Sequence, residues 1–365
     1  MYSLLSLSTL LTLCLNKSIQ NNIKHKNIVK IIIPMAGRGS RLRPHTLTVP
    51  KPLVPVVGKP IVERLVEDLA RSAKEKIEEI AFIVGDFGEE AEKELLKVAE
   101  NVGSKGRICY QDQPLGTAHA IMCAKESLDG NVIVAFADTL FKADFSINLD
   151  HDGVIWVQKV ADPSAYGVVQ LDENEVINNF VEKPKEFVSD LAIIGIYYFR
   201  DGAYLRSELE YVIDNEIKDK GEYQLTTALE NMRQKGTKFR TGQVEEWLDC
   251  GNKDAVVFTN QRYLEYLTER KTETLISKSA NIENSVIIEP VFLADGVHLK
   301  NSVVGPHVSI GKNTHIHNSR VQNSVIQSDT FVESALLENT MLGNFVKYNG
   351  KAENLSLGDY SEVKK

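Results

Sequence analysis

Short apolar runs alternate with helix-like patterns over the first 140 residues or so. A β-branched run over residues 28–33 ends in a Pro/Gly-rich turn, which predicts a buried strand. From Pro60 onward, apolar residues recur at helical spacing. The same reasoning predicts further strands at 80–84 and 131–137. It predicts further helices at 89–100 and 116–128. Strands alternating with helices of this length indicate a parallel sheet with helices on both faces.

The pattern changes between residues 154 and 199. Four strand-like pieces follow in close succession there, which predicts an antiparallel or mixed insertion covering one side of the sheet. Two helices, a strand and a long charged helix are then expected, at 204–217, 225–234, 237–244 and 253–270.

A six-residue repeat occupies the C-terminal part of the chain. Aliphatic residues open successive units at Val304, Ile310 and Ile316, and an earlier copy out of phase opens at Ile288. Hexapeptide repeats are typical of a parallel β-helix, in which three short strands form one coil. The segment has room for about four coils. A small sandwich of alternating strands is the alternative.

Composition narrows the class of protein. The 42 basic and 50 acidic side chains give a formal charge of −8, which argues against a general nucleic-acid binder. The four cysteines lie far apart without CxxC spacing, so we expect a reduced, cytoplasmic protein. The apolar stretch from Leu4 to Leu15 is too short to span a bilayer, and we expect no membrane association. We interpret residues 1–27 as a disordered tail or an over-extended translation start, with a signal sequence as the alternative.

The turn after the first strand, M-A-G-R-G-S-R-L-R-P, carries the first candidate chemistry. It lacks the Lys-Ser/Thr pair of the Walker loop and the third glycine of the dinucleotide loop, where Leu42 stands. What remains is a set of backbone N–H groups, a serine hydroxyl and guanidinium groups, an arrangement that suits a triphosphate. The candidate residues are Ala36, Gly37, Gly39, Ser40 and Arg41. The alternative is a glycine turn with solvated arginines.

A lysine and two acids are further candidate binding residues. We expect them at the same edge of the predicted sheet as the glycine turn, where the carboxyl ends of the parallel strands lie. Lys51 stands between two prolines, which restrict the backbone and can fix the position of its charge. Asp138 follows a predicted buried strand, and Asp249 follows a second short apolar segment. Two carboxylates aimed at one rim fit a Mg²⁺ site, because Mg²⁺ prefers hard oxygen ligands. The alternative for Lys51 is an exposed lysine in a connecting segment. The alternative for each acid is a helix cap or a turn-forming residue.

Two further motifs contain candidate binding residues. In Q-D-Q-P-L-G-T, Gln111 could read the edge of a base and Gly116 permits close approach to a flat ring, whereas Thr117 could simply cap the next helix. In V-E-K-P, Lys183 offers a cation for a second phosphate and Glu182 a carboxylate for sugar hydroxyls. The alternative for this pair is an exposed charged turn.

Together these motifs resemble the sugar-1-phosphate nucleotidyltransferase family, which includes glucose-1-phosphate thymidylyltransferases. The resemblance runs from about residue 30 to 270, with a hexapeptide-repeat β-helix appended as in several relatives. It rests on motifs in the family's order, MAGRGSRLRP, KPLVPV, GKPIVERLVEDL, QPLGTAHA, FADTLF, YGVV, VEKP, GIYYF, GEYQLTTAL and WLDCGN. One departure is Ala137, where the family usually has glycine before the aspartate.

The resemblance implies a reaction and a role for each residue. A nucleoside triphosphate and a sugar 1-phosphate would give a nucleoside-diphosphate sugar and pyrophosphate. Arg41 would hold the departing pyrophosphate, Lys51 the α-phosphate and Lys183 the sugar phosphate. Mg²⁺ would bind Asp138 and Asp249. The implied nucleotide site adds Gln111, Gly116 and Thr117 to the glycine turn, and the implied sugar pocket contains Gly167, Glu182 and Thr226.

The substrates are narrower expectations. The QPLGTA motif resembles users of dTTP or UTP, with glucose 1-phosphate as the expected sugar. Alternatives are a catalytically silent regulatory subunit, a mannose-1-phosphate guanylyltransferase and a UDP-N-acetylglucosamine pyrophosphorylase. The β-helix is too short for the acetyl-transfer site of bifunctional relatives, so we interpret its histidines as capping or surface residues: His298, His307, His315 and His317.

The predicted fold class is therefore α/β. A Rossmann-like mixed sheet with helices on both faces is followed by a short left-handed parallel β-helix. We expect an extension over 1–27, a nucleotidyltransferase domain over 28–272, a β-helix over 273–350 and a tail over 351–365. A homo-oligomer formed through the β-helix or the catalytic domain is also expected.

Overall fold

The computed structural model describes residues 28–37, 39–73, 75–142 and 148–351. The expected N-terminal extension and most of the expected C-terminal tail lie outside them. The contacts divide the chain into two compact units. Among the described residues, the first contains 28–54 and 60–250, and the second contains 55–59 and 251–351. The helix α7 (Lys253–Arg270) therefore groups with the second unit, whereas the sequence boundary after residue 272 assigned it to the first.

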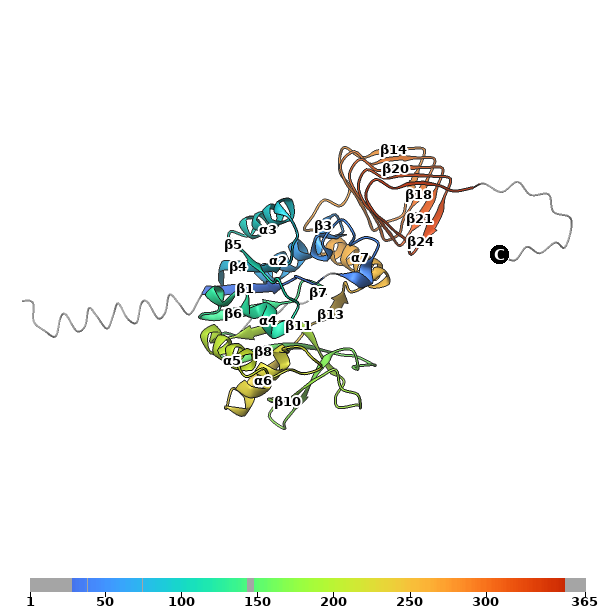
Figure 1. The fold of residues 1–365 in the computed structure, drawn as a ribbon. Coiled ribbons are helices and arrows are strands. Elements are labelled where there is room, and N and C mark those ends of the chain that lie inside the picture. Colours follow the sequence, from blue (N-terminus) through green and yellow to red (C-terminus); the bar gives the residue numbers. More distant parts are fainter. Residues whose placement is uncertain (1–27, 38, 74, 143–147, 352–365) are drawn as a thin grey trace, which may run out of the picture. The chain divides into compact units, whose positions relative to one another are not determined.

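A nine-stranded mixed sheet forms the centre of the first unit (Figure 1). Its strands run in the order β10-β9-β11-β6-β1-β4-β5, with β8 paired to β11 and β12 paired to β8. Strands β4, β1 and β6 are parallel neighbours, and β5 is parallel to β4. These four are β1 (Ile28–Pro34), β4 (Lys76–Val84), β5 (Lys105–Tyr110) and β6 (Asn131–Ala135). Ile31, Ile32 and Ile33 are fully buried, as the β-branched run predicts.

The strand-rich region from 153 to 199 extends this sheet instead of covering it. Strand β11 pairs antiparallel with β6, and β8 and β9 pair antiparallel with β11. The expected antiparallel pairing is confirmed. The expectation that this segment covers one side of the sheet was wrong, because β6 leaves an edge whose backbone groups β11 satisfies. The remaining strands are β8 (Gly153–Lys159), β9 (Gly167–Leu171), β10 (Ile177–Glu182), β11 (Leu191–Phe199) and β12 (Phe239–Gln243). Strands β7 (Thr139–Lys142) and β13 (Glu246–Asp249) pair antiparallel in a separate two-stranded sheet.

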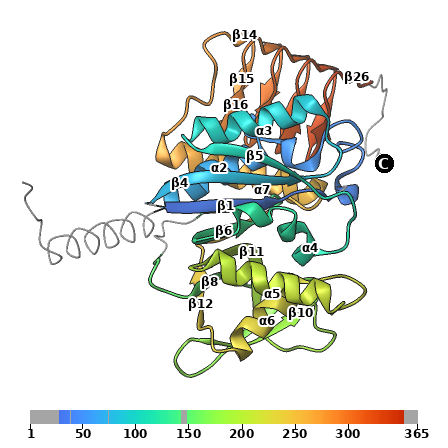
Figure 2. The same cartoon turned by 60° about the vertical axis from the view of Figure 1, so that its left-hand side comes forward.

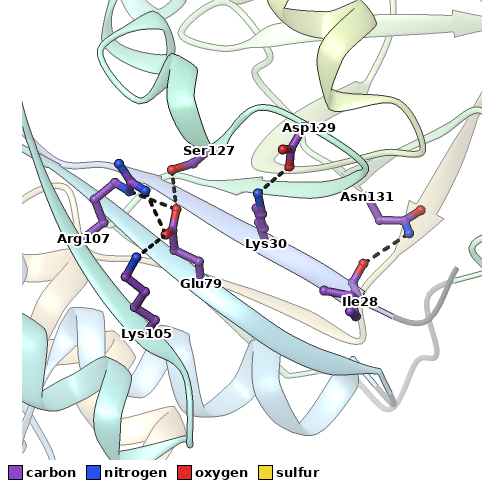
Figure 3. Close-up of polar contacts among 8 residues, drawn as sticks. All are labelled: Ile28, Lys30, Glu79, Lys105, Arg107, Ser127, Asp129 and Asn131. Carbon is purple, nitrogen blue, oxygen red and sulfur yellow. Dashed lines mark hydrogen bonds and ion pairs between the residues drawn. The ribbon is translucent and has the colours of Figure 1, made fainter. Parts of the chain in front are cut away.

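Helices cover both faces of the large sheet (Figure 2), which confirms the predicted fold class. Helices α2 and α3 pack together, and α4, α5 and α6 form a second group. Their bounds are α2 (Ile61–Ser72), α3 (Glu89–Asn101), α4 (Thr117–Met122), α5 (Gly202–Asp214) and α6 (Leu225–Gln234). The helix predicted over 116–128 is shorter than expected, because it gives way to a 3-10 helix, η3 (Lys125–Ser127). There the Ser127 hydroxyl donates a hydrogen bond to the buried carboxylate of Glu79 (Figure 3).

The second unit contains a parallel β-helix, as predicted. Its strands stack in three parallel sheets and complete four coils before β26 begins a fifth. Val304, Ile310 and Ile316 are each fully buried, which confirms the six-residue phase. Ile288 is 41% exposed, so the earlier repeat was placed one residue late: Ile287 pairs with Val304.

The strands of the β-helix are short. They are β14 (Asn281–Glu283), β15 (Val286–Ile287), β16 (Val291–Leu293), β17 (His298–Lys300), β18 (Val303–Val304), β19 (Val308–Ile310), β20 (His315–His317), β21 (Arg320–Gln322), β22 (Ser324–Ile326), β23 (Phe331–Glu333), β24 (Leu336–Glu338), β25 (Met341–Leu342) and β26 (Lys347–Asn349). A small hairpin of β2 (Pro55–Val56) and β3 (Lys59–Pro60) contacts α7. Within the described part of the chain, no helix is long and apolar enough to cross a membrane.

Candidate functional site

The predicted site residues follow the carboxyl ends of adjacent parallel strands. The glycine turn follows β1, Asp138 follows β6 and Gln111 follows β5. Because β6, β1, β4 and β5 are consecutive neighbours, these segments lie along one rim of the sheet. Ligands of open α/β sheets bind at this edge.

The glycine turn is shaped by a tight contact at Gly39. Gly39 has a φ of +59°, and a Cβ atom there would lie 2.8 Å from Cβ of Lys51. The Thr46 hydroxyl donates a hydrogen bond to the Gly39 carbonyl oxygen at 2.8 Å. Glycine is thus required both for the backbone conformation and for the approach of the lysine segment. The following 3-10 helix η1 (Ser40–Leu42) buries Leu42 and leaves Ser40 and Arg41 exposed.

Lys51 is a buried cation with a specific partner. The residue begins the 3-10 helix η2 (Lys51–Leu53) and is only 9% exposed. Its Nζ atom donates a hydrogen bond to Oδ2 of Asp138 at 2.9 Å. The alternative of an exposed connector lysine is therefore wrong, since a buried ammonium group requires a partner of this kind.

The two predicted acids come from strands that meet. Asp249 ends β13 and pairs in the two-stranded sheet with Thr139, the residue after Asp138. The Cys250 N–H donates to the Asp138 carbonyl oxygen at 2.9 Å. Two segments more than a hundred residues apart in sequence thus place Asp138 and Asp249 side by side. Their carboxylates are of the hard-oxygen type that divalent magnesium prefers.

A cavity of about 290 Å³ opens beside these acids. Some of its lining residues follow the carboxyl ends of the parallel strands. Others belong to β9, β10, β11 and α6. Of the predicted residues, those lining it are Arg41, Thr117, Asp138, Gly167, Glu182, Lys183, Thr226 and Asp249. The others lie outside the lining: Ala36, Gly37, Gly39, Ser40, Lys51, Gln111 and Gly116.

The three residues expected in a sugar pocket are direct neighbours. Gly167 pairs with Glu182 across β9 and β10. The Thr226 hydroxyl donates to Oε2 of Glu182 at 3.2 Å. A Cβ atom on Gly167 would lie 3.0 Å from that same Oε2 and 3.4 Å from Cγ2 of Thr226. A glycine, a carboxylate and a hydroxyl thus line one wall and offer hydrogen bonds to a polyol.

Lys183 lies at the mouth of the cavity. Its side chain is 51% exposed, and its Nζ is 3.6 Å from Oε1 of Glu182. Its φ of +44° is unusual for a lysine. The Lys183 N–H donates to the Tyr166 carbonyl at 3.0 Å, and Lys220 Nζ donates to the Lys183 carbonyl at 2.7 Å. The turn is thus held by hydrogen bonds while its ammonium group remains accessible to an anion.

The glutamine motif is explained partly by contacts within the protein. Gly116 has a φ of +120°, and a Cβ atom there would lie 2.4 Å from the Tyr223 carbonyl oxygen. The close approach of the Tyr223 backbone therefore requires glycine at position 116, independently of any ligand. The Thr117 hydroxyl does not cap its own helix but accepts a hydrogen bond from the Leu225 N–H at 2.8 Å, at the start of α6. The amide of Gln111 lies 3.1 Å from Nδ1 of His119.

Sequence reasoning missed the aromatic residues of the cavity. Tyr166 and Trp247 pack edge to face with ring centroids 5.0 Å apart, and both line it. Burial, followed by the nearby charge of Asp249, raises the pKa of the Tyr166 hydroxyl, which therefore stays protonated as a hydrogen-bond donor. Both residues belong to motifs already singled out, YGVV and WLDCGN, so a signal was present.

Comparison with known proteins identifies the family. Residues 30–266 match the family model described as Nucleotidyl transferase. The chain belongs to this family. A low-salt glycan biosynthesis nucleotidyltransferase, Agl11 of Haloferax volcanii, is 30% identical over 366 residues, with 92% of this chain and 100% of the relative covered. A glucose-1-phosphate thymidylyltransferase of Streptomyces antibioticus is 28% identical, with 92% of this chain and 99% of the relative covered.

A solved structure shows the same fold. A UDP-glucose pyrophosphorylase complexed with UDP-glucose superposes with a TM-score of 0.53 and 24% sequence identity, covering 66% of this chain and 99% of its own. The two sequence relatives match more of this nucleotidyltransferase than the family model does, so their similarity continues into the C-terminal repeat.

Proposed function

We propose that this nucleotidyltransferase transfers a thymidylyl or uridylyl group from dTTP or UTP to glucose 1-phosphate. The products are a nucleoside-diphosphate sugar and pyrophosphate. An oxygen of the sugar phosphate attacks the α-phosphorus, and the bond from that phosphorus to the bridging oxygen of the β-phosphate breaks. Pyrophosphate leaves with the electron pair of that bond.

The observation that supports this proposal is the composition of one cavity. The paired acids Asp138 and Asp249 and the cation Arg41 line it together with the polyol-type wall of Gly167, Glu182 and Thr226. A site for triphosphate chemistry and a site for sugar hydroxyls are thus adjacent. Reactants held in this way are positioned for in-line displacement, which supplies much of the acceleration in phosphoryl-type transfers.

Three cations divide the phosphate groups among them in this proposal. Lys51, fixed beside Asp138, contacts the α-phosphate that is attacked. Arg41 holds the β- and γ-phosphates and stabilises the charge that develops on pyrophosphate. Lys183, at the sugar end of the cavity, binds the phosphate of the sugar.

The acids fit the divalent cation that we propose as Mg²⁺. Asp138 and Asp249 offer carboxylate oxygens from adjacent strand ends. Bound there, Mg²⁺ would neutralise triphosphate charge and leave its other positions to water and phosphate oxygens. Before substrate arrives, Asp138 supplies the counter-charge for Lys51, so the buried ammonium group has a partner.

Gln111 and the glycine turn have separate roles, and the choice of base rests on Gln111. A glutamine amide can pair with the edge that thymine and uracil share, and Ala36, Gly37, Gly39 and Ser40 approach the phosphates with their backbone N–H groups. Gly116 and Thr117 complete this nucleotide site. The thymidylyltransferase relative favours dTTP.

We also keep as predictions a homo-oligomeric assembly and a cytoplasmic location.

One experiment tests the proposal against its alternatives. Pyrophosphate release is measured for each of four nucleoside triphosphates with glucose, mannose and N-acetylglucosamine 1-phosphates, with and without Mg²⁺. We expect turnover only with dTTP or UTP, glucose 1-phosphate and the metal. Preference for GTP with mannose 1-phosphate, or for UTP with the N-acetylglucosamine substrate, would support the corresponding alternative. No turnover with any pair would support a catalytically silent subunit.

A further inference from the structure

Three histidines gather on one outer face of the β-helix. His298 pairs directly with His315 on the neighbouring coil, and Lys300 pairs with His317. Leu299 and Ile316, the residues between them, are fully buried. Because side chains alternate along a strand, His298, His315 and His317 project from the opposite, outer face.

The three imidazoles are close enough to contact one bound ion. Their ring centroids lie 5.2 to 5.9 Å apart. One ring nitrogen from each lies within 4.8 Å of the others. Phe331, on the next coil, packs edge to face against His317 with a centroid distance of 5.3 Å and closes one side of the group.

Two of these rings carry buried nitrogens without a hydrogen-bond partner. They are Nε2 of His298 and Nε2 of His317. Glu283 places Oε2 3.6 Å from Nε2 of His298, beyond hydrogen-bond distance, and its other oxygen lies 3.3 Å from Nζ of Lys300. Glu333 pairs with His317 on the next coil. Buried polar atoms are rarely left in this state, because each costs free energy.

The closeness of the three rings favours binding of one cation over protonation of all three. Burial, followed by the charges of His298 and His315, lowers the pKa of His317. A neutral imidazole has a lone pair to donate to a cation. Three protonated rings at these distances would repel one another, whereas three neutral rings around one cation would not.

We propose that His298, His315 and His317 form a binding site for a divalent transition metal, with Zn²⁺ as the preferred ion. Imidazole ligands suit Zn²⁺, Ni²⁺ and Cu²⁺ but not Mg²⁺ or Ca²⁺, which require oxygen. Zinc–nitrogen bonds of about 2.1 Å place tetrahedral ligands about 3.4 Å apart. Small side-chain rotations, chiefly of the exposed His315, close the remaining gap. The site has three protein ligands and a fourth position open to solvent.

This site differs from the capping or surface role that the sequence suggested for these residues. It also excludes the fourth histidine of the repeat, since His307 points to α7 and lies 2.8 Å from Oε1 of Glu265. The site is separate in chemistry from the acid pair Asp138 and Asp249. It does not depend on the proposed reaction.

The test is a zinc titration of the full chain, prepared without a polyhistidine tag and freed of metal. Millimolar Mg²⁺ in the buffer occupies sites built from carboxylates. We expect one equivalent of Zn²⁺ to bind, by calorimetry or competition with a chromophoric chelator. Substitution of Co²⁺ should give the visible absorption of a four-coordinate site. Zinc should also raise the unfolding temperature, because it binds the folded chain.

The variants identify the ligands. His315→Ala changes an exposed side chain, so it should fold normally while weakening zinc binding by about 100-fold or more. His307→Gln keeps a donor for Glu265 and serves as the matched control, with unchanged zinc affinity expected. Absence of a saturable site, or equal zinc binding by the parent chain and His315→Ala, would overturn the proposal.

Discussion

The ammonium group of Lys51 lies 2.9 Å from the carboxylate of Asp138, although 87 positions separate the two residues in sequence. Lys51 is fixed by a turn between prolines and Asp138 by the end of a buried strand. The side chain of Lys51 is 10% exposed and that of Asp138 is 39% exposed. The pair thus joins a buried cation to an acid that faces the cavity.

The first prediction concerns the charges of this pair. Asp138→Asn should lower the rate of pyrophosphate release by a factor of about 100 to 1000, the usual cost of one preorganised electrostatic contact. Lys51→Met should cost at least as much, because it also leaves Asp138 without its partner. Steady-state turnover with saturating substrates is the measurement.

A lysine remote from the cavity provides the control. Lys30 forms an ion pair with Asp129, just before β6, which Figure 3 shows. Lys30→Met should therefore leave turnover close to that of the parent chain. If Asp138→Asn retained full activity, the proposed metal site would be wrong.

The second prediction separates the two substrates. Gly167→Ala would place a methyl group 3.0 Å from Oε2 of Glu182 and 3.3 Å from Cδ1 of Ile193. We expect KM for the sugar phosphate to rise about tenfold, equivalent to about 1.4 kcal/mol, with little change in KM for the triphosphate. Initial rates over a matrix of both substrate concentrations provide the measurement. An effect confined to the triphosphate would reverse our assignment of the two ends of the cavity.

Local patterns in the sequence predicted much of the secondary structure. The helices expected at 225–234 and 253–270 match α6 and α7, because their ends carry local signals such as the Asn252 side chain that accepts from the Ala255 N–H. The β-helix followed from its period. Asp138 and Asp249 were found because acids at strand ends tend to share a rim.

Long-range contacts explain what the sequence did not predict. The requirement for glycine at 116 comes from the backbone of Tyr223, and the hydroxyl of Thr117 serves Leu225 on another helix. Neither partner is near in sequence. The zinc site escaped prediction for the same reason, since His298 and His315 become neighbours only when successive coils stack.

The third prediction is a pH dependence of stability. Burial alone would raise the pKa of Glu79, but hydrogen bonds from Ser127 and Arg107 and the charges of Arg107 and Lys105 outweigh it, so the pKa lies below its ordinary value of 4.5 (Figure 3). The stabilisation is complete above that ordinary value. It is lost as the pH falls through the lowered pKa of the folded state.

Glu79→Gln should therefore lower the free energy of unfolding by about 2 kcal/mol at pH 7, the scale of hydrogen bonds to a charged group. The difference from the parent chain should shrink at acid pH. Urea unfolding midpoints between pH 3 and pH 7, values chosen about the ordinary carboxyl pKa, measure it. Glu78→Gln, a neighbouring exposed position, is the control and should have no effect. A difference that did not vary with pH would contradict the assignment.

The fourth prediction concerns Asn260, a fully buried amide of α7. Its Oδ1 accepts hydrogen bonds from the Val57 N–H at 3.1 Å and from the Ser309 hydroxyl at 2.7 Å. It thereby joins the β2–β3 hairpin, α7 and β19 within the second unit. Asn260→Ala removes the acceptor of both hydrogen bonds at a fully buried position, so we expect a loss of about 3 kcal/mol in stability.

Ser309→Ala removes only one of these bonds and leaves the Val57 contact in place, so its cost should be nearer to about 1 kcal/mol. Thermal unfolding compares the two variants. Hydrogen exchange then locates the effect, because the Val57 amide should exchange faster in Asn260→Ala and remain protected in Ser309→Ala. Equal protection of Val57 in both variants would mean that the hairpin is held by its apolar contacts, such as Gly58 against the Phe292 ring, and not by the amide.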